Sequence, residues 1–191
     1  MTETVPSAIA AQLAALDIPS TIDIKRYPSI VALFEEALAT YRDEAACSSV
    51  GHTLSYADLD GLSAQFAGWL QHGAGLSRGD RVAIQMPNLI QYLVVCLGAL
   101  RAGMVVVNTN PLYTERELEH QLNDANVKVM GLQANVAQTA AAVLPKTDVE
   151  TVVVTEIADL HPQPKRTLIN FLVKYVKRMV PAFSIPGALK L

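Results

Sequence analysis

The sequence predicts an α/β fold in which a layered, largely parallel sheet is flanked by helices and preceded by a β-hairpin. Short, almost wholly apolar runs occur at residues 82–86, 104–107, 128–132 and 151–155. Such runs are typical of strands that are covered on both faces. The stretches between them are long enough for helices, and strands that alternate with helices favour a parallel sheet.

The N-terminal elements are predicted from helical spacing. Residues 1–24 read as an arm that frays or docks on a neighbour, with a helical turn or two at 7–16. Apolar side chains at 29–41 follow the spacing of a helix, and Ser29 suits its N-cap.

A hairpin and a second helix follow. Residues 45–50 and 53–56 flank Gly51-His52 and predict the β-hairpin. The stretch Ser55-Tyr-Ala-Asp58 then begins a helix with apolar residues along one face, and Gly73-Ala-Gly75 ends it.

The central unit is a strand, a helix and a second strand. Residues 89–102 are long enough for about four helical turns, and Gly103 is placed to cap the C-terminus. Only Gln91 and Arg101 in this helix are strongly polar. A helix that is apolar nearly all round needs cover from the sheet on one side and from another element on the other.

Two further helices are indicated by their ends. Thr114 and Glu117 have the spacing of a capping box, in which each side chain bonds the backbone N–H of the other. Residues 135–144 predict a helix that Pro145 stops.

The last segment differs in composition. His161-Pro-Gln-Pro164 is typical of a linker, and residues 167–180 predict an amphipathic helix whose polar arc holds Asn170 with Lys174, Lys177 and Arg178. This helix is too short to span a bilayer but can lie on one. Packing on its own domain, contact with anionic lipid and insertion into a partner's groove all remain open.

Two loops are the candidate binding site. Ligands of open α/β sheets bind at the carboxyl ends of strands. The loops expected there contain six residues that we regard as close to substrate: Pro87, Asn88, Asn108, Asn110, Pro111 and Tyr113.

Composition narrows the function classes. The 191 residues are 51% hydrophobic and carry a net charge of −3, which gives no electrostatic case for nucleic-acid binding. Two cysteines, Cys47 and Cys96, exclude a disulfide framework and fit a reducing compartment. We see no secretory signal and no membrane-spanning run, so we expect a cytoplasmic protein.

Familiar catalytic and phosphate-binding motifs are not found. Gly73-Ala-Gly75 precedes a strand where a dinucleotide fingerprint would follow one, and no Walker loop occurs. Glu117 and His120 have the spacing of half a di-metal site, but such sites need two copies. We therefore expect no metal ligand here, and no nucleophile lies on a recognisable elbow.

Several longer stretches form a recognisable pattern: Tyr27-Pro-Ser-Ile-Val, Thr53-Leu-Ser-Tyr-Ala-Asp-Leu, Leu76-Ser-Arg-Gly-Asp-Arg-Val-Ala, Arg101-Ala-Gly-Met-Val-Val-Val-Asn and Asn110-Pro-Leu-Tyr-Thr-Glu-Arg-Glu-Leu-Glu-His. They resemble the amino-terminal part of acyl-adenylate-forming enzymes. Together with Asn170-Phe-Leu-Val-Lys-Tyr-Val-Lys-Arg-Met-Val-Pro181, the last of them looks most like the bacterial long-chain fatty-acid–CoA ligases. One departure is Glu115, where the family commonly has Pro. Both residues suit the first turn of a helix.

The resemblance implies an ATP-dependent ligase that uses Mg²⁺ and CoA to activate a long-chain fatty acid. It also implies that the chain is roughly the first third of such an enzyme and that the catalytic and cofactor-binding residues lie beyond Leu191. On this basis we divide the chain into an arm at 1–24, an α/β subdomain at 25–160 and, at 161–191, a linker with the basic helix leading into the remainder of the same chain. The fragment alone is expected to be inactive.

Other interpretations stay open. The chain can belong to a ligase for aromatic or shorter acids, or be a stand-alone module that binds lipid or protein. The resemblance also suggests a homodimer and peripheral contact with the inner face of the cell membrane.

Overall fold

The sheet that the sequence predicts is present in the computed structural model, which describes residues 7–19, 23 and 25–191. The chain divides into two units, Met1–Glu35 and Glu36–Leu191. The boundaries predicted after residues 24 and 160 stay predictions, and part of the expected arm, residues 1–6, 20–22 and 24, lies outside the described residues.

Two helices form the N-terminal region. Helix α1 (Ser7–Ala15) covers the expected helical turns, and α2 (Ile30–Thr40) follows it. The backbone N–H of Ala32 donates to Ser29 Oγ at 3.1 Å, so Ser29 caps α2 as its sequence position predicts.

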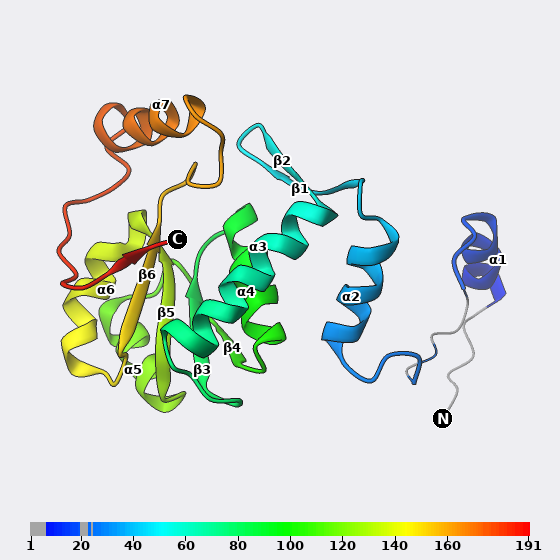
Figure 1. Cartoon of the computed structure of the whole chain (residues 1–191), viewed down its shortest axis with the longest axis horizontal. Coiled ribbons are helices and arrows are strands. Elements are labelled where there is room, and N and C mark those ends of the chain that lie inside the picture. The colour runs from blue at the N-terminus through cyan, green and yellow to red at the C-terminus, as the bar shows by residue number, and fades with distance from the viewer. Residues whose placement is uncertain (1–6, 20–22, 24) are drawn as a thin grey trace. The chain divides into compact units, whose positions relative to one another are not determined.

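Five parallel strands form the sheet within the described part of the chain, in the order β4-β3-β5-β6-β7 (Figure 1). Their bounds are Val105–Asn108 for β4, Arg81–Gln85 for β3, Val127–Gln133 for β5, Thr151–Thr155 for β6 and Leu189–Lys190 for β7. All except β7 correspond to the apolar runs of the sequence. Because the strands are parallel, their carboxyl ends meet at one edge of the sheet.

Helices cover both faces of this sheet (Figure 1). On one face, α5 (Glu115–Asp124) and α6 (Ala137–Val143) bury apolar side chains such as Leu118 against Met130 and Leu132 of β5. Short 3₁₀ turns, Ala134–Val136 and Leu144–Lys146, flank α6. Successive side chains of β5 point to opposite faces of the sheet, so both faces present apolar side chains and both need helices to cover them.

Helix α4 (Ile90–Arg101) occupies the other face and is covered in turn by α3 (Tyr56–Gly68), which a π-helical turn, Trp69–Gly73, continues. Gly98 permits the close approach of the two helices, since a Cβ there would lie 2.8 Å from the backbone oxygen of Ser63. The two-sided cover expected for the apolar helix is therefore confirmed.

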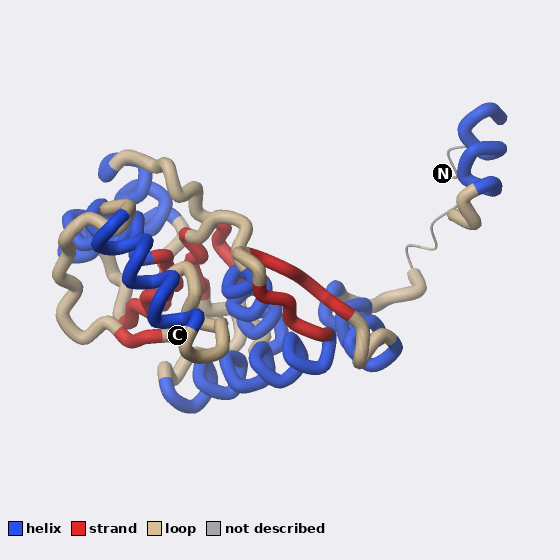
Figure 2. The backbone as a smooth tube through the Cα atoms, turned by 90° about the horizontal axis from the view of Figure 1, so that it is seen from above, coloured by secondary structure: helices blue, strands red, loops and turns tan. Residues whose placement is uncertain are grey.

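The β-hairpin lies against α3 and α4 (Figure 2). Strand β1 (Ala45–Ser49) pairs antiparallel with β2 (His52–Ser55). Positive φ angles at Val50 and Gly51, 52° and 74°, form the two-residue turn. The turn predicted at Gly51-His52 is thus wrong by one residue: a turn with left-handed φ at both positions takes Val50 and Gly51, and His52 already pairs in the ladder.

The C-terminal segment departs most from prediction. Helix α7 (Lys165–Phe171) and its π-helical continuation, Leu172–Val176, begin before residue 167 and stop before residue 180. Arg178 has a φ of +54°, which ends the helical path. The apolar spacing continues through Met179 and Val180, so periodicity alone extended the helix too far.

Candidate functional site

The carboxyl edge of the sheet gathers polar side chains in an otherwise apolar fold. Strands β3, β5 and β6 end in Gln85, Gln133 and Thr155, all buried, and β4 ends in Asn108. The two loops predicted from the sequence follow β3 and β4 at this edge.

The first loop is short and open. Pro87 and Asn88 are exposed after β3, and Asn88 lines a shallow cavity of about 290 Å³ with Cys47 of the hairpin and Tyr92 of α4. The cavity wall is mainly apolar, so it can accept a hydrocarbon or a similar uncharged group.

The second loop is held by hydrogen bonds to neighbouring elements. Tyr92 Oη donates to Asn108 Oδ1 at 2.9 Å, and Gln121 Nε2 of α5 donates to the Asn108 carbonyl at 3.2 Å. Asn110 Oδ1 accepts from the Leu112 N–H at 2.9 Å, which closes a local turn around Pro111. Tyr92 thus links the two predicted loops, because it belongs to the helix that begins directly after the first.

The start of α5 fixes the end of the second loop, immediately after Tyr113. Thr114 Oγ1 accepts from the Glu117 N–H at 3.4 Å, and Glu117 Oε2 accepts from the Thr114 N–H at 2.9 Å, as the sequence predicts. The Thr114 N–H and the Thr114 hydroxyl both donate to the Glu117 carboxylate, which favours its charged form and lowers the pKa of Glu117 below its ordinary value of 4.5.

Three buried glutamines at or near this edge were not predicted. Gln85 Nε2 donates to the Asn110 carbonyl at 3.2 Å, and Gln91 Nε2 donates to the Glu156 and Ile157 carbonyls at 3.0 and 3.2 Å. The side-chain oxygens of Gln85, Gln91 and Gln133 have no hydrogen-bond partner among the described residues. The available signal was a Gln inside the apolar runs of β3 and α4 and directly after that of β5, since a buried amide needs partners.

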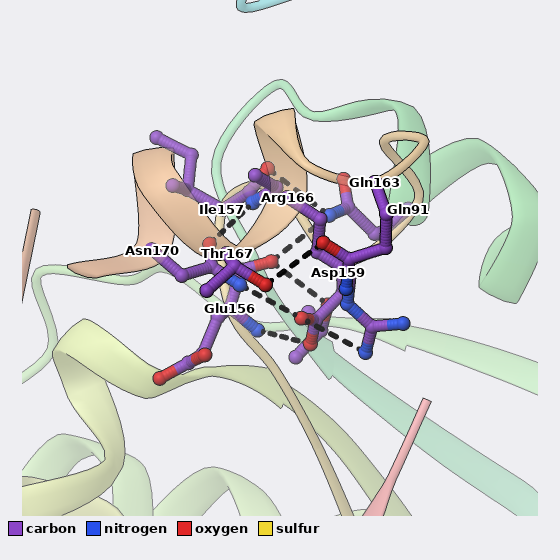
Figure 3. Close-up of polar contacts among 10 residues, drawn as sticks. Gln91, Glu156, Ile157, Asp159, Gln163, Arg166, Thr167 and Asn170 are labelled. Atoms are coloured by element: carbon purple, nitrogen blue, oxygen red, sulfur yellow. Dashed lines mark hydrogen bonds and ion pairs between the residues drawn. The ribbon is translucent and has the colours of Figure 1, made fainter. Parts of the chain in front are cut away.

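A polar network centred on Asp159 joins the end of β6 to α7 (Figure 3). The buried Asp159 carboxylate accepts from the Glu156 N–H at 2.7 Å and from Asn170 Nδ2 at 3.0 Å, and it pairs with Arg166 at 3.3 Å. Asn170 Oδ1 accepts from the Ala158 N–H at 2.9 Å. Asn170, which the sequence places on the polar arc of the helix, therefore points toward the body of the protein, where its amide bonds the Ala158 backbone and the Asp159 side chain.

The three predicted membrane-surface residues, Lys174, Lys177 and Arg178, are exposed at the end of the helical segment. Lys174 Nζ lies 5.6 Å from the centre of the Tyr175 ring. The site and the basic cluster belong to different elements, but both follow carboxyl ends of strands in the sheet.

The remaining reactive side chains offer little chemistry. Burial raises the pKa of the Cys96 thiol, opposed by a bond with Tyr92, and burial likewise raises that of Cys47. Both thiols therefore stay protonated near neutral pH and are poor nucleophiles. Across residues 7–19, 23 and 25–191, no group of three or more His, Cys, Asp or Glu side chains could hold a metal ion. Nor is any described helix long and apolar enough to cross a bilayer.

Comparison with known proteins agrees with this architecture. A family model described as AMP-binding enzyme matches residues 34–182. The chain belongs to the AMP-binding enzyme family. Its matched part includes both candidate loops and all of α7.

Curated relatives of the chain include bacterial long-chain-fatty-acid–CoA ligases. The chain is 47% identical to that of Escherichia coli O157:H7 over 91% of its own length, and 43% identical to that of Haemophilus influenzae over 87%. It spans only about a third of these relatives, 31% and 30% of their respective lengths.

Solved structures share the fold. The MbtA protein of Mycobacterium smegmatis matches with a TM-score of 0.65 and 24% identity, over 98% of this chain and 34% of that one. The anthranilate CoA ligase AuaEII matches with a TM-score of 0.64 and 19% identity, over 73% of this chain and 26% of that one. The layered α/β fold predicted from the sequence is thereby confirmed, and these two proteins share it.

Proposed function

We propose that the chain is the N-terminal part of an ATP-dependent long-chain fatty-acid–CoA ligase. The observation that carries this proposal is the 47% identity to such ligases over 91% of the chain. Support also comes from the second loop, because Asn110 to Glu117 belongs to the stretch that carries the sequence resemblance. Several hydrogen bonds hold this stretch at the carboxyl edge of the sheet, where open α/β sheets generally bind ligands.

The proposed reaction has two steps. A fatty carboxylate oxygen attacks the α-phosphorus of ATP, which forms an acyl-AMP and releases pyrophosphate. The CoA thiolate then attacks the acyl carbonyl carbon, which forms the thioester and releases AMP. Mg²⁺ would neutralise phosphate charge when bound. On the basis of the family resemblance, we assign ATP, Mg²⁺ and catalysis to other parts of the native enzyme.

This chain would contribute walls close to the substrates. The loop residues Pro87, Asn88, Asn108, Asn110, Pro111 and Tyr113 are candidates for that role. The bond from Tyr92 to Asn108 connects the second loop to α4 and favours one orientation of the Asn108 side chain. A positioning role predicts an effect on substrate affinity more than on protein stability.

The proposal extends to location and partners. We infer a cytoplasmic enzyme that touches the inner face of the membrane through Lys174, Lys177 and Arg178, and that forms a homodimer. Long-chain fatty acid is its proposed substrate, because that is the substrate named for the curated relatives.

Acid-dependent ATP–pyrophosphate exchange tests this function on the protein encoded by the native reading frame. We expect exchange with palmitate to exceed exchange with octanoate or benzoate. Exchange with benzoate alone would assign a ligase for aromatic acids, and no exchange with any acid would leave a binding module.

A pair of variants tests the loop. Tyr92→Phe removes only the hydroxyl that bonds Asn108, and we expect it to lower kcat/KM several-fold. Leu112→Ala alters a side chain of the same loop that is 87% exposed and should leave kcat/KM unchanged. Equal values for Tyr92→Phe and wild type would remove the positioning role while leaving the ligase assignment intact.

A further inference from the structure

Helix α7 is oriented with its polar side toward the protein. Asn170 and Arg166 both reach Asp159, and Asn170 also accepts a backbone bond from Ala158 (Figure 3). Since Asp159 is buried and Arg166 is half-buried, this side of the helix cannot turn to solvent without breaking the network.

The opposite side of the helical segment is apolar and faces solvent. Its side chains are between 41% and 60% exposed, and we call them the outward surface: Leu168, Phe171, Leu172, Tyr175 and Val176. An amphipathic helix on a soluble domain normally buries its apolar side. The arrangement here is the reverse, and a contiguous exposed apolar surface marks an interaction site.

The charge of the segment around the outward surface indicates the kind of partner that fits it. Residues 160–191 contain six Lys or Arg and no Asp or Glu, whereas residues 1–159 contain nine Lys or Arg and eighteen Asp or Glu. The acidic chain thus carries a basic C-terminal segment, and Lys174, Lys177 and Arg178 lie next to the outward surface. Apolar side chains bordered by Lys and Arg fit the interface of an anionic bilayer. The apolar side chains enter the boundary of the acyl chains, and the Lys and Arg side chains contact the headgroups.

We propose that the outward surface docks on an anionic lipid bilayer. The proposal deepens the membrane contact inferred above by naming the side chains that enter lipid, and it rests on that contact but not on ligase activity. The helical segment, twelve residues from Lys165 to Val176, lies in the plane of the interface. Tyr175 suits the headgroup boundary, and Lys174 beside its ring keeps its charge in the polar layer.

Vesicle co-sedimentation of the protein encoded by the native reading frame tests the proposal. The probes are phosphatidylglycerol vesicles and neutral phosphatidylcholine vesicles, and we expect binding to the former only. The charge variant Lys174→Glu/Lys177→Glu/Arg178→Glu should lower the partition coefficient at least about 100-fold. Each Lys or Arg near an anionic surface raises the partition coefficient about fivefold.

The apolar variant is Phe171→Ser/Val176→Ser, which should lower partition at least about tenfold. Matched controls make the same changes elsewhere. Arg78→Glu/Arg81→Glu/Arg116→Glu reverses three exposed charges on other elements, and Val105→Ser/Leu112→Ser replaces two exposed apolar side chains. Both controls should bind as wild type does.

The outcomes separate the occupants of the surface. Weakened binding by both α7 variants, with unaffected controls, supports docking on lipid. Wild-type binding by either α7 variant, or no binding of the wild type to phosphatidylglycerol, overturns it. If Phe171→Ser/Val176→Ser lowers the melting temperature and leaves vesicle binding unchanged, another part of the native protein covers the surface and the proposal is wrong. ATP–pyrophosphate exchange in detergent reports on the ligase separately.

Discussion

The Asp159 network provides a quantitative test of how α7 is held. Asp159→Ala removes a buried carboxylate that accepts from the Glu156 N–H, from Asn170 Nδ2 and, at 3.4 Å, from Thr155 Oγ1. Asn170→Ala removes one of these donors. Arg166→Ala removes the ion pair alone, whose guanidinium side is 38% exposed.

The expected costs follow from burial. Hydrogen bonds to a charged group are worth about 1.5 to 3 kcal/mol, and Asp159→Ala also leaves buried donors unpaired, so we expect a loss of about 3 to 5 kcal/mol. Asn170→Ala should cost about 1 to 3 kcal/mol. Arg166→Ala should cost less than about 1 kcal/mol, because solvent reaches the half-buried guanidinium and screens its charge, and the hydrogen bonds to the Asp159 carboxylate remain.

Urea unfolding followed by circular dichroism measures these differences. The free energy of unfolding should be highest for wild type and only slightly lower for Arg166→Ala. It should be lower for Asn170→Ala and lowest for Asp159→Ala. A loss as large for Arg166→Ala as for Asp159→Ala would show that the ion pair, and not the buried hydrogen bonds, holds the helix. A loss below about 1 kcal/mol for Asp159→Ala would refute the reasoning altogether.

Two further predictions concern local packing and pH. Gly98→Ala should destabilise the protein by about 1 to 3 kcal/mol, because its Cβ would meet the Ser63 oxygen at 2.8 Å; Gly61→Ala, with nothing within 4 Å of its Cβ, should be neutral or stabilising in the same thermal melts. The lowered pKa of Glu117 means that its carboxylate stabilises the folded protein above its ordinary pKa of 4.5 and that this contribution is lost as pH falls through the lower folded value. The stability advantage of wild type over Glu117→Gln should therefore shrink in acid. An advantage that stays constant from pH 7 to acid would contradict the capping role. Glu115→Gln, in the same helical turn, serves as the control.

Features determined by nearby residues were predictable from the sequence. Thr114 and Glu117 are three residues apart, so their mutual bonds require only the start of a helix. The four longer strands were predictable for a similar reason, because each contains enough apolar residues to show that both faces are covered.

Features that depend on contacts between residues far apart in the sequence could not be predicted. Gln91 donates a hydrogen bond to the Glu156 carbonyl, 65 residues away in the sequence. Asn170 donates to Asp159, and this bond forms only when α7 lies next to the segment that follows β6. Strand β7, at two residues, is too short to produce a pattern. The candidate loops could be placed at the correct edge from topology, but the bond between Tyr92 and Asn108 that joins them needed coordinates.

The position of α7 determines how an enzyme of this kind would meet its substrate. The helix follows the carboxyl end of β6, and Figure 1 shows it beyond the same strand ends that carry the candidate loops. A molecule docked through α7 would therefore hold those loops close to the headgroup layer. Fatty acid dissolved in the bilayer would then arrive by lateral diffusion in two dimensions, and its supply would depend on its concentration in lipid rather than on its low solubility in water.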